Sequence, residues 1–121
     1  MAYYKKETGD IGEDLALKFL SSKGMKLIER NFRCNFGEID LIFRDKNALV
    51  FVEVKLRKSN FFGDAALAVN IRKQKKIVNI AKYYLQNKRL NPESIRFDVF
   101  GIEKDEGKWI CKHYRNAFYS E

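Results

Sequence analysis

The order of periodic segments predicts one α/β domain, in which two helices flank a central mixed β-sheet. Segments with helical periodicity near residues 10–22 and 71–88 alternate with five segments of strand character. The strand expected over Leu49–Lys55 is apolar on both faces, which is typical of a central strand covered on each side. The chain of 121 residues is long enough for a real core and suits a single domain over residues 1–121.

The first helix is expected to begin near Thr8 or Asp10, after a frayed polar segment, and to run to about Ser22. Its apolar residues lie on two adjoining tracks at helical spacing, and Glu13 falls on the second track. Two interpretations of Glu13 are open. It can belong to a capping box, Asp10-x-x-Glu13, or it can point along the apolar track and reach the sheet. The two are not fully exclusive.

Three antiparallel strands are expected next, over Met25–Arg33, Gly37–Phe43 and Leu49–Lys55. The second and third are joined by a turn. If Lys46 and Asn47 form a two-residue hairpin loop, residue i pairs with residue 93 − i. The register of this hairpin decides which charged side chains meet.

The two-residue loop opposes Asp40 to Glu53 and Glu38 to Lys55. Opposed Cβ atoms lie about 4.5–5.5 Å apart. Two carboxylates at such a short distance repel each other unless they share a proton or a cation. Glu53 and Lys55 project from the same face of their strand. A loop one residue longer would make the Asp40–Glu53 contact diagonal, still within reach of a shared ion.

The alternative for these charges is a solvated strand edge with ordinary cross-strand ion pairs. The apolar faces of Leu49–Lys55 argue against it, because an uncompensated charge at the end of a buried strand is costly.

The second helix is expected over Ile71–Lys88 and is strongly basic. Between residues 71 and 89 there is no acidic residue, and the basic ones are Arg72, Lys73, Lys75, Lys76, Lys82, Lys88 and Arg89. A solvated helix face normally mixes both signs of charge, so this face favours phosphate contact. Arg57 and Lys58 follow the third strand and suit the same role. Gln74 lies on the apolar track and can face the acidic residues.

Two more strands, Ser94–Ile102 and Lys108–Tyr114, complete the expected sheet. Asp98 is expected to partner Arg96 or a backbone group. The single histidine, His113, is expected to be a surface or half-buried strand residue without a role as ligand or base.

Composition favours a polyanionic partner. Net charge is +8, from 24 basic and 16 acidic residues, which suits nucleic acid or a membrane surface. The chain contains no apolar run of membrane-spanning length and no signal peptide, so we expect a soluble cytoplasmic protein without membrane attachment. Cys34 and Cys111 are expected to be reduced, buried apolar residues.

Six segments carry a resemblance to a known family: Gly12–Ala16, Asn31–Cys34, Gly37–Ile42, Val50–Lys55, Arg96–Val99 and Asn116–Phe118. In this order they resemble the PD-(D/E)xK nuclease superfamily. More closely, the chain resembles the YraN-like family of small bacterial proteins related to archaeal Holliday-junction resolvases. This resemblance implies a restriction-endonuclease-like αβββαβ core.

The resemblance also implies roles for individual residues. Asp40 and Glu53 would be metal ligands, together with the carbonyl of Val54. Lys55 would orient or deprotonate the attacking water, or stabilise the pentavalent phosphate. Glu13 would complete the metal site.

Gln74 would be an accessory catalytic residue from the second helix. Ile39 stands where the superfamily often has proline, a departure that the family itself shows.

Oxygen ligands of this kind suit Mg²⁺ or Mn²⁺. The implied function is a metal-dependent endonuclease acting on branched or structured DNA. The residues expected to hold the nucleic-acid backbone are Arg57, Lys58, Arg72, Lys73, Lys75 and Lys76. A non-catalytic nucleic-acid-binding module that acts with a partner protein is the alternative, and RNA remains open as a substrate. Because resolvase relatives act as symmetric dimers, a homodimer is expected.

Overall fold

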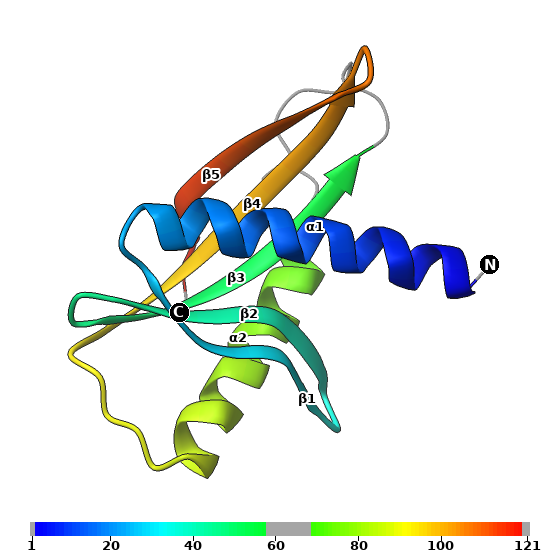
Figure 1. Ribbon diagram of the computed structural model, residues 1–121. Coiled ribbons are helices and arrows are strands. Elements are labelled where there is room, and N and C mark those ends of the chain that lie inside the picture. Colours follow the sequence, from blue (N-terminus) through cyan, green and yellow to red (C-terminus); the bar gives the residue numbers. More distant parts are fainter. Residues whose placement is uncertain (1, 58–68, 120–121) are drawn as a thin grey trace.

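The computed structural model describes residues 2–57 and 69–119, which form two helices and one five-stranded sheet (Figure 1). The elements in chain order are α1 (Ala2–Ser22), β1 (Lys26–Cys34), β2 (Gly37–Asp45), β3 (Ala48–Arg57), α2 (Ile71–Asn87), β4 (Ser94–Asp105) and β5 (Lys108–Phe118). The strand order is β1-β2-β3-β4-β5. Strands β3 and β4 are parallel and the other neighbours are antiparallel, so the expected mixed α/β fold is confirmed.

The two helices cover opposite faces of the sheet, α1 in front and α2 behind in Figure 1. The core is accordingly divided in two. The α1 side is filled mainly by Ala16, Leu20, Leu41, Phe43, Val50, Val52, Phe100 and Ile102. The α2 side is filled mainly by Ile42, Phe51, Ile77, Ile80, Ala81, Tyr84, Phe97 and Val99. This arrangement leaves the ends of the strands as the places where polar side chains can gather.

Strand β3 is the buried centre of the sheet, as its sequence predicts. Val50, Phe51 and Val52 are each at most 1% exposed and alternate between the two halves of the core. The register between β2 and β3 is also as expected, since Asp45 pairs with Ala48 across a two-residue loop.

The beginning of α1 was predicted wrongly. The helix starts at Ala2, so Asp10 lies inside it and cannot be its cap. Residues 2–8 contain no proline or glycine, and lysine and glutamate favour helix, so nothing in this stretch stops the helix. The end after Ser22 is as predicted: Gly24 adopts a φ of 91°, and the N–H of Met25 donates to the carbonyl of Leu20 at 3.2 Å.

The last two strands are longer than predicted. The ladder between β4 and β5 continues to the pair Asp105–Lys108, because a hairpin can keep its backbone hydrogen bonds beyond the core. At the other end, Phe118 belongs to β5 and stacks on Phe97 with ring centroids 5.2 Å apart. The sheet therefore extends to Phe118, beyond the strand end expected at Tyr114.

Two smaller expectations concern the cysteines and membrane-spanning segments. Cys34 and Cys111 are free, as expected, but half-buried, because they lie on the two edge strands of the sheet. Neither α1 nor α2, as far as the structure describes them, has an apolar stretch that could cross a bilayer.

Candidate active site

The candidate site lies where β2 and β3 separate. Their ladder runs from Asp45–Ala48 to Leu41–Val52 and ends there. Beyond this pair the N–H of Val54 donates to Oδ2 of Asp40 at 2.8 Å, so a side chain takes the place of a backbone acceptor. Figure 1 shows the two strands diverging from this point. The carboxylate of Asp40 is thereby held at the opening between the two central strands.

Asp40 and Glu53 are brought together in this opening, as the hairpin register predicts. The pKa of Asp40 is raised from 3.8 to about 7, mainly by burial and next by the negative charge of Glu53. The hydrogen bond from the N–H of Val54 opposes this shift. Glu53 is itself buried, with its side chain 8% exposed. The site therefore concentrates negative charge that a proton or a cation would stabilise.

Lys73 supplies one such cation. Its Nζ lies 3.5 Å from Oε2 of Glu53. Asn70 caps α2, and its Oδ1 accepts the N–H of Lys73 at 2.9 Å, which fixes the first helical turn beside β3. Sequence patterns predict Lys73 only as a phosphate contact. A signal for its pairing with Glu53 was available in the sequence: Lys73 is a basic residue in the first turn of α2, the helix that follows β3.

Lys55 lies two residues after Glu53 on β3, half-buried and paired in the ladder with Gly101 of β4. The predicted contact between Glu38 and Lys55 was wrong. Glu38 instead forms an exposed ion pair with Nε of Arg33 at 2.9 Å. The reason is the divergence of the strands, because β2 stays paired with β1 after it leaves β3.

Glu13 points at the sheet from α1 and is 9% exposed. Burial raises its pKa, a hydrogen bond from Arg30 opposes the rise, and the charge of Asp40 adds to it. Nε of Arg30 donates to Oε1 of Glu13 at 3.1 Å. The neighbouring Asn31 adopts a left-handed φ of 56° and also hydrogen-bonds to Glu13. Glu13 therefore influences Asp40 while its carboxylate is bound to a guanidinium.

The residues fit a divalent ion through a small protein donor set. Within residues 2–57 and 69–119, no three His, Cys, Asp or Glu side chains lie close enough together to hold a metal. The N–H and C=O of one residue in an extended strand point the same way, so the carbonyl of Val54 faces the side of Asp40. Two carboxylates and one carbonyl suit Mg²⁺, which keeps several waters and often uses only one or two carboxylates. The carboxylate of Glu13 is instead bound to Arg30.

The remaining predicted residues lie on α2, at the end of β3 or outside the described residues. The side-chain amide of Gln74 donates to the carbonyl of Val69 at 2.8 Å. Gln74 also lines a separate hollow of about 370 Å³ with Lys75 and Tyr119. Lys58 lies outside the described residues. The exposed basic residues of α2 include Arg72, Lys75, Lys76 and Lys82.

Comparison with known proteins places the chain in a family. The model of "Uncharacterised protein family UPF0102" matches residues 12–102. The chain belongs to the UPF0102 family. UPF0102 is the YraN family, so the family expected from the sequence motifs is confirmed.

Relatives within UPF0102 are similar over most of their length. A UPF0102 protein of Janthinobacterium sp. (strain Marseille) is 45% identical over 106 residues, covering 88% of this chain and 85% of the relative. A UPF0102 protein of Syntrophus aciditrophicus is 48% identical over 101 residues, covering 83% of this chain and 80% of the relative. A UPF0102 protein of Alcanivorax borkumensis is 41% identical over 119 residues, covering 97% of this chain and 95% of the relative. These names state a family and no activity.

Proposed function

We propose that this UPF0102 protein is a metal-dependent endonuclease that hydrolyses phosphodiester bonds in DNA, with branched or structured DNA as its substrate. One observation carries the proposal: Asp40 and Glu53 meet at the splayed end of the central strands, where burial and mutual repulsion raise the pKa of Asp40 to about 7. A buried acidic pair is unfavourable by itself and becomes favourable when a cation binds it. A cytoplasmic location is part of this proposal.

In this proposal Asp40, Glu53 and the Val54 carbonyl hold Mg²⁺ or Mn²⁺. A bound ion would supply Lewis-acid neutralisation of the charge that develops on the phosphoryl oxygens. Lys55, on the same strand face as Glu53, orients the attacking water or takes its proton at Nζ. Lys73 compensates the charge of Glu53 in the metal-free protein and can turn to the phosphate backbone when that carboxylate is otherwise engaged.

The basic face of α2 supplies the binding surface for DNA. Its exposed cations, Arg72, Lys75, Lys76 and Lys82, lie on the helix whose first turn contacts Glu53. Contacts to phosphates give binding that depends on salt and little on sequence. A homodimer, as in resolvases, would present two such surfaces to a branched substrate.

The test is cleavage of end-labelled four-way junction, flap and linear DNA, and of RNA of matched shape, in Mg²⁺, Mn²⁺ or chelator. The variants are Asp40→Asn and Glu53→Gln, and the matched control is Glu38→Gln, an exposed acid on β2. We expect metal-dependent cutting that falls at least 100-fold in both site variants and persists in the control. Equal traces of cutting in all four proteins would indicate contamination and contradict the proposal.

A second candidate is a non-catalytic nucleic-acid-binding module that acts with a partner protein. One observation favours it: Glu13 and Glu53 already have cationic partners within the protein, Arg30 and Lys73. Metal-independent, salt-sensitive binding without any cutting by the pure protein would support this candidate over the nuclease.

A further inference from the structure

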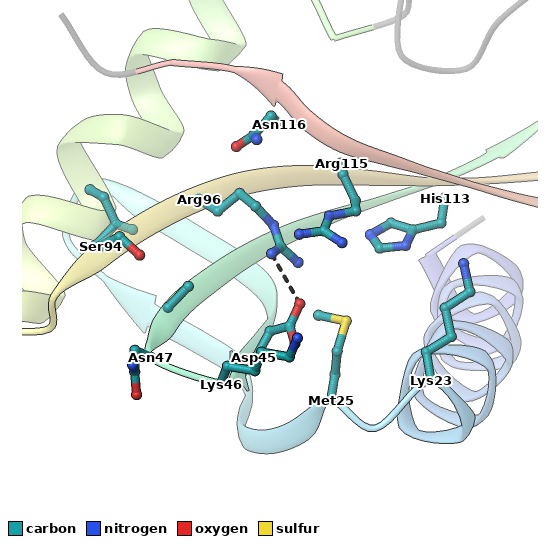
Figure 2. A pocket seen from close by; sticks show the side chains of 12 residues that line it. Lys23, Met25, Asp45, Lys46, Asn47, Ser94, Arg96, His113, Arg115 and Asn116 are labelled. Atoms are coloured by element: carbon teal, nitrogen blue, oxygen red, sulfur yellow. Dashed lines mark hydrogen bonds and ion pairs between the residues drawn. The ribbon is translucent and has the colours of Figure 1, made fainter.

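A second polar site lies at the other end of the central strands. A hollow of about 620 Å³ opens between the end of α1, the β2–β3 turn, the start of β4 and the end of β5 (Figure 2). Ala48 lines it at the start of β3, about 16 Å along the strand from Glu53 at 3.3 Å per residue. Met25, another lining residue, packs in the α1 half of the core, whereas Glu53 contacts α2. The hollow is therefore distinct from the candidate active site.

Most of the charged side chains around this hollow are cationic. Lys23 follows α1, Lys46 is at the tip of the β2–β3 turn, and Arg115 projects from β5. All three are exposed, and each lines the hollow from a different part of the chain. Figure 2 shows Arg115 directed toward Arg96, with His113 between these residues and Lys23. Among the lining residues the single carboxylate is Asp45.

The floor of the hollow is a fixed hydrogen-bond network centred on Asp98. Nε and Nη2 of Arg96 donate to the two carboxylate oxygens of Asp98 at 2.9 and 3.1 Å. Nη1 of Arg96 donates to Oδ2 of Asp45 at 3.0 Å. Nε2 of His113 lies 2.7 Å from Oδ2 of Asp98, and the N–H of Asn116 donates to Oδ1 at 3.1 Å.

This network holds Arg96 and His113 rigidly, with side chains 7% and 3% exposed. Because these groups are already ordered, a ligand would not have to immobilise them. Asp98 and Asp45 compensate the charge of Arg96, so the surplus positive charge comes from the three exposed cations. The hollow thus combines an ordered, charge-compensated floor with an exposed cationic rim, and this rim suits an anion.

We propose that this hollow binds a phosphate monoester of about nucleotide size. A volume of 620 Å³ falls within the range of small-molecule sites, roughly 300–1,000 Å³. Three exposed cations around one hollow suit the dianionic phosphate group. Asn47 and Ser94 offer hydrogen bonds, and Met25 and Ile95 offer apolar contact, to the organic part. This inference goes beyond the proposed nuclease and does not depend on it.

Calorimetric titration in chelator and low salt tests the proposal, because chelator keeps metal away from the acidic pair. The ligands are AMP, adenosine, inorganic phosphate, and a dinucleotide with or without a 5′-phosphate. The variant is Arg115→Gln combined with Lys46→Asn. Asparagine tolerates the left-handed φ of 57° at position 46, so the turn is preserved. The matched control is Lys112→Gln, an exposed cation on β5 outside the hollow.

We expect saturable binding of AMP, weaker binding of inorganic phosphate and none of adenosine. Loss of two charge-assisted hydrogen bonds should weaken AMP binding by roughly 10- to 100-fold in the double variant, with little change in the control. If the phosphorylated dinucleotide binds more tightly than AMP and responds to the double variant, a strand end is the source of the phosphate. If AMP binds at least as tightly, the source is a free nucleotide.

Three results would overturn the proposal. The first is adenosine binding as tightly as AMP. The second is AMP affinity unchanged in the double variant but lost in Lys75→Gln on α2. The third is absence of binding of any phosphate ester at millimolar concentration. None of these results bears on metal-dependent cleavage, so the two proposals fail separately.

Discussion

At the residue scale, the raised pKa of Asp40 predicts that its negative charge destabilises the fold. Its pKa of about 7, against 3.8 ordinarily, means that the folded state binds a proton more tightly than the unfolded state. The stability contributed by this group is complete below pH 4 and is lost as the pH rises to about 7. Asp40→Asn keeps an acceptor for the N–H of Val54 and removes the charge.

We therefore expect Asp40→Asn in chelator to be more stable than the wild type at pH 8, by roughly 2–4 kcal/mol. The difference should shrink to near zero at pH 4. Urea unfolding at several pH values between 4 and 8 measures it. Parallel stability curves for the two proteins across this range would contradict the argument.

A cation should reverse this effect. Millimolar Mg²⁺ or Mn²⁺ is expected to raise the melting temperature of the wild type, because an ion that binds only the folded state stabilises it. Asp40→Asn and Glu53→Gln should lose most of this increase. Thermal unfolding with and without metal measures it, and Glu38→Gln, whose carboxylate pairs with Arg33, is the control. An increase of equal size in all variants would place the metal elsewhere.

At the element scale, α2 has two roles: its apolar residues pack in the core, and its basic residues contact Glu53 of the acidic pair or form an exposed surface. Its buried stripe fills the core, and its first turn places Lys73 beside Glu53. Its exposed cations extend away from that contact. The helix thus connects the acidic pair to a surface suited to phosphates.

Removal of these cations should weaken DNA binding without unfolding the protein. For Arg72→Gln, Lys76→Gln and Lys82→Gln, we expect the slope of log affinity against log salt to decrease by about one for each residue that contacts a phosphate. Fluorescence anisotropy over a series of salt concentrations measures this slope. Lys108→Gln, exposed at the start of β5, is the control. An unchanged slope in the triple variant would exclude α2 as the DNA-binding face.

At the scale of the whole molecule, Asp98 ties three parts of the sheet together. It is fully buried, and it contacts Arg96 on its own strand and His113 on β5. Through Arg96 it also reaches Asp45 at the β2–β3 turn. Burial alone would raise the pKa of Asp98, but hydrogen bonds from His113 and Arg96 hold it below its ordinary value.

Asp98→Ala is expected to destabilise the fold by roughly 3–5 kcal/mol at pH 7, because it leaves a buried guanidinium without its main partner. The lowered pKa also means that the contribution of Asp98 is present at neutral pH and is lost as the pH falls below 4. Urea unfolding at pH 7 measures the loss. Glu93→Ala, an exposed residue before β4, should change stability by less than about 0.5 kcal/mol.

Local sequence predicted the elements and the acidic pair because their causes are local. The apolar residues of β3 indicate burial on both faces, and a two-residue loop sets its register with β2, which opposes Asp40 to Glu53. The predicted start of the first helix was wrong. The possible cap at Asp10 suggested a start there, but residues 2–8 contain no helix breaker, and α1 begins at Ala2.

The contacts across the fold could not be predicted in the same way. Arg30 is 17 residues from Glu13, and the two meet only because α1 crosses β1. His113 was expected to be an ordinary strand residue. The register between β5 and β4 instead brings its ring within hydrogen-bonding distance of the carboxylate of Asp98. No local pattern encodes which distant ion pairs form when strands and helices pack.

The sequence by itself determined the order of elements, the family and the residues of the acidic pair, because periodicity, turn length and motif spacing are properties of neighbouring residues. Only the tertiary structure decided which cations accompany each acid, where β2 leaves β3, and that a second cationic hollow exists at the far end of the sheet. These depend on distances between elements that are remote in the chain, and burial in the folded protein sets the pKa of the groups that meet there.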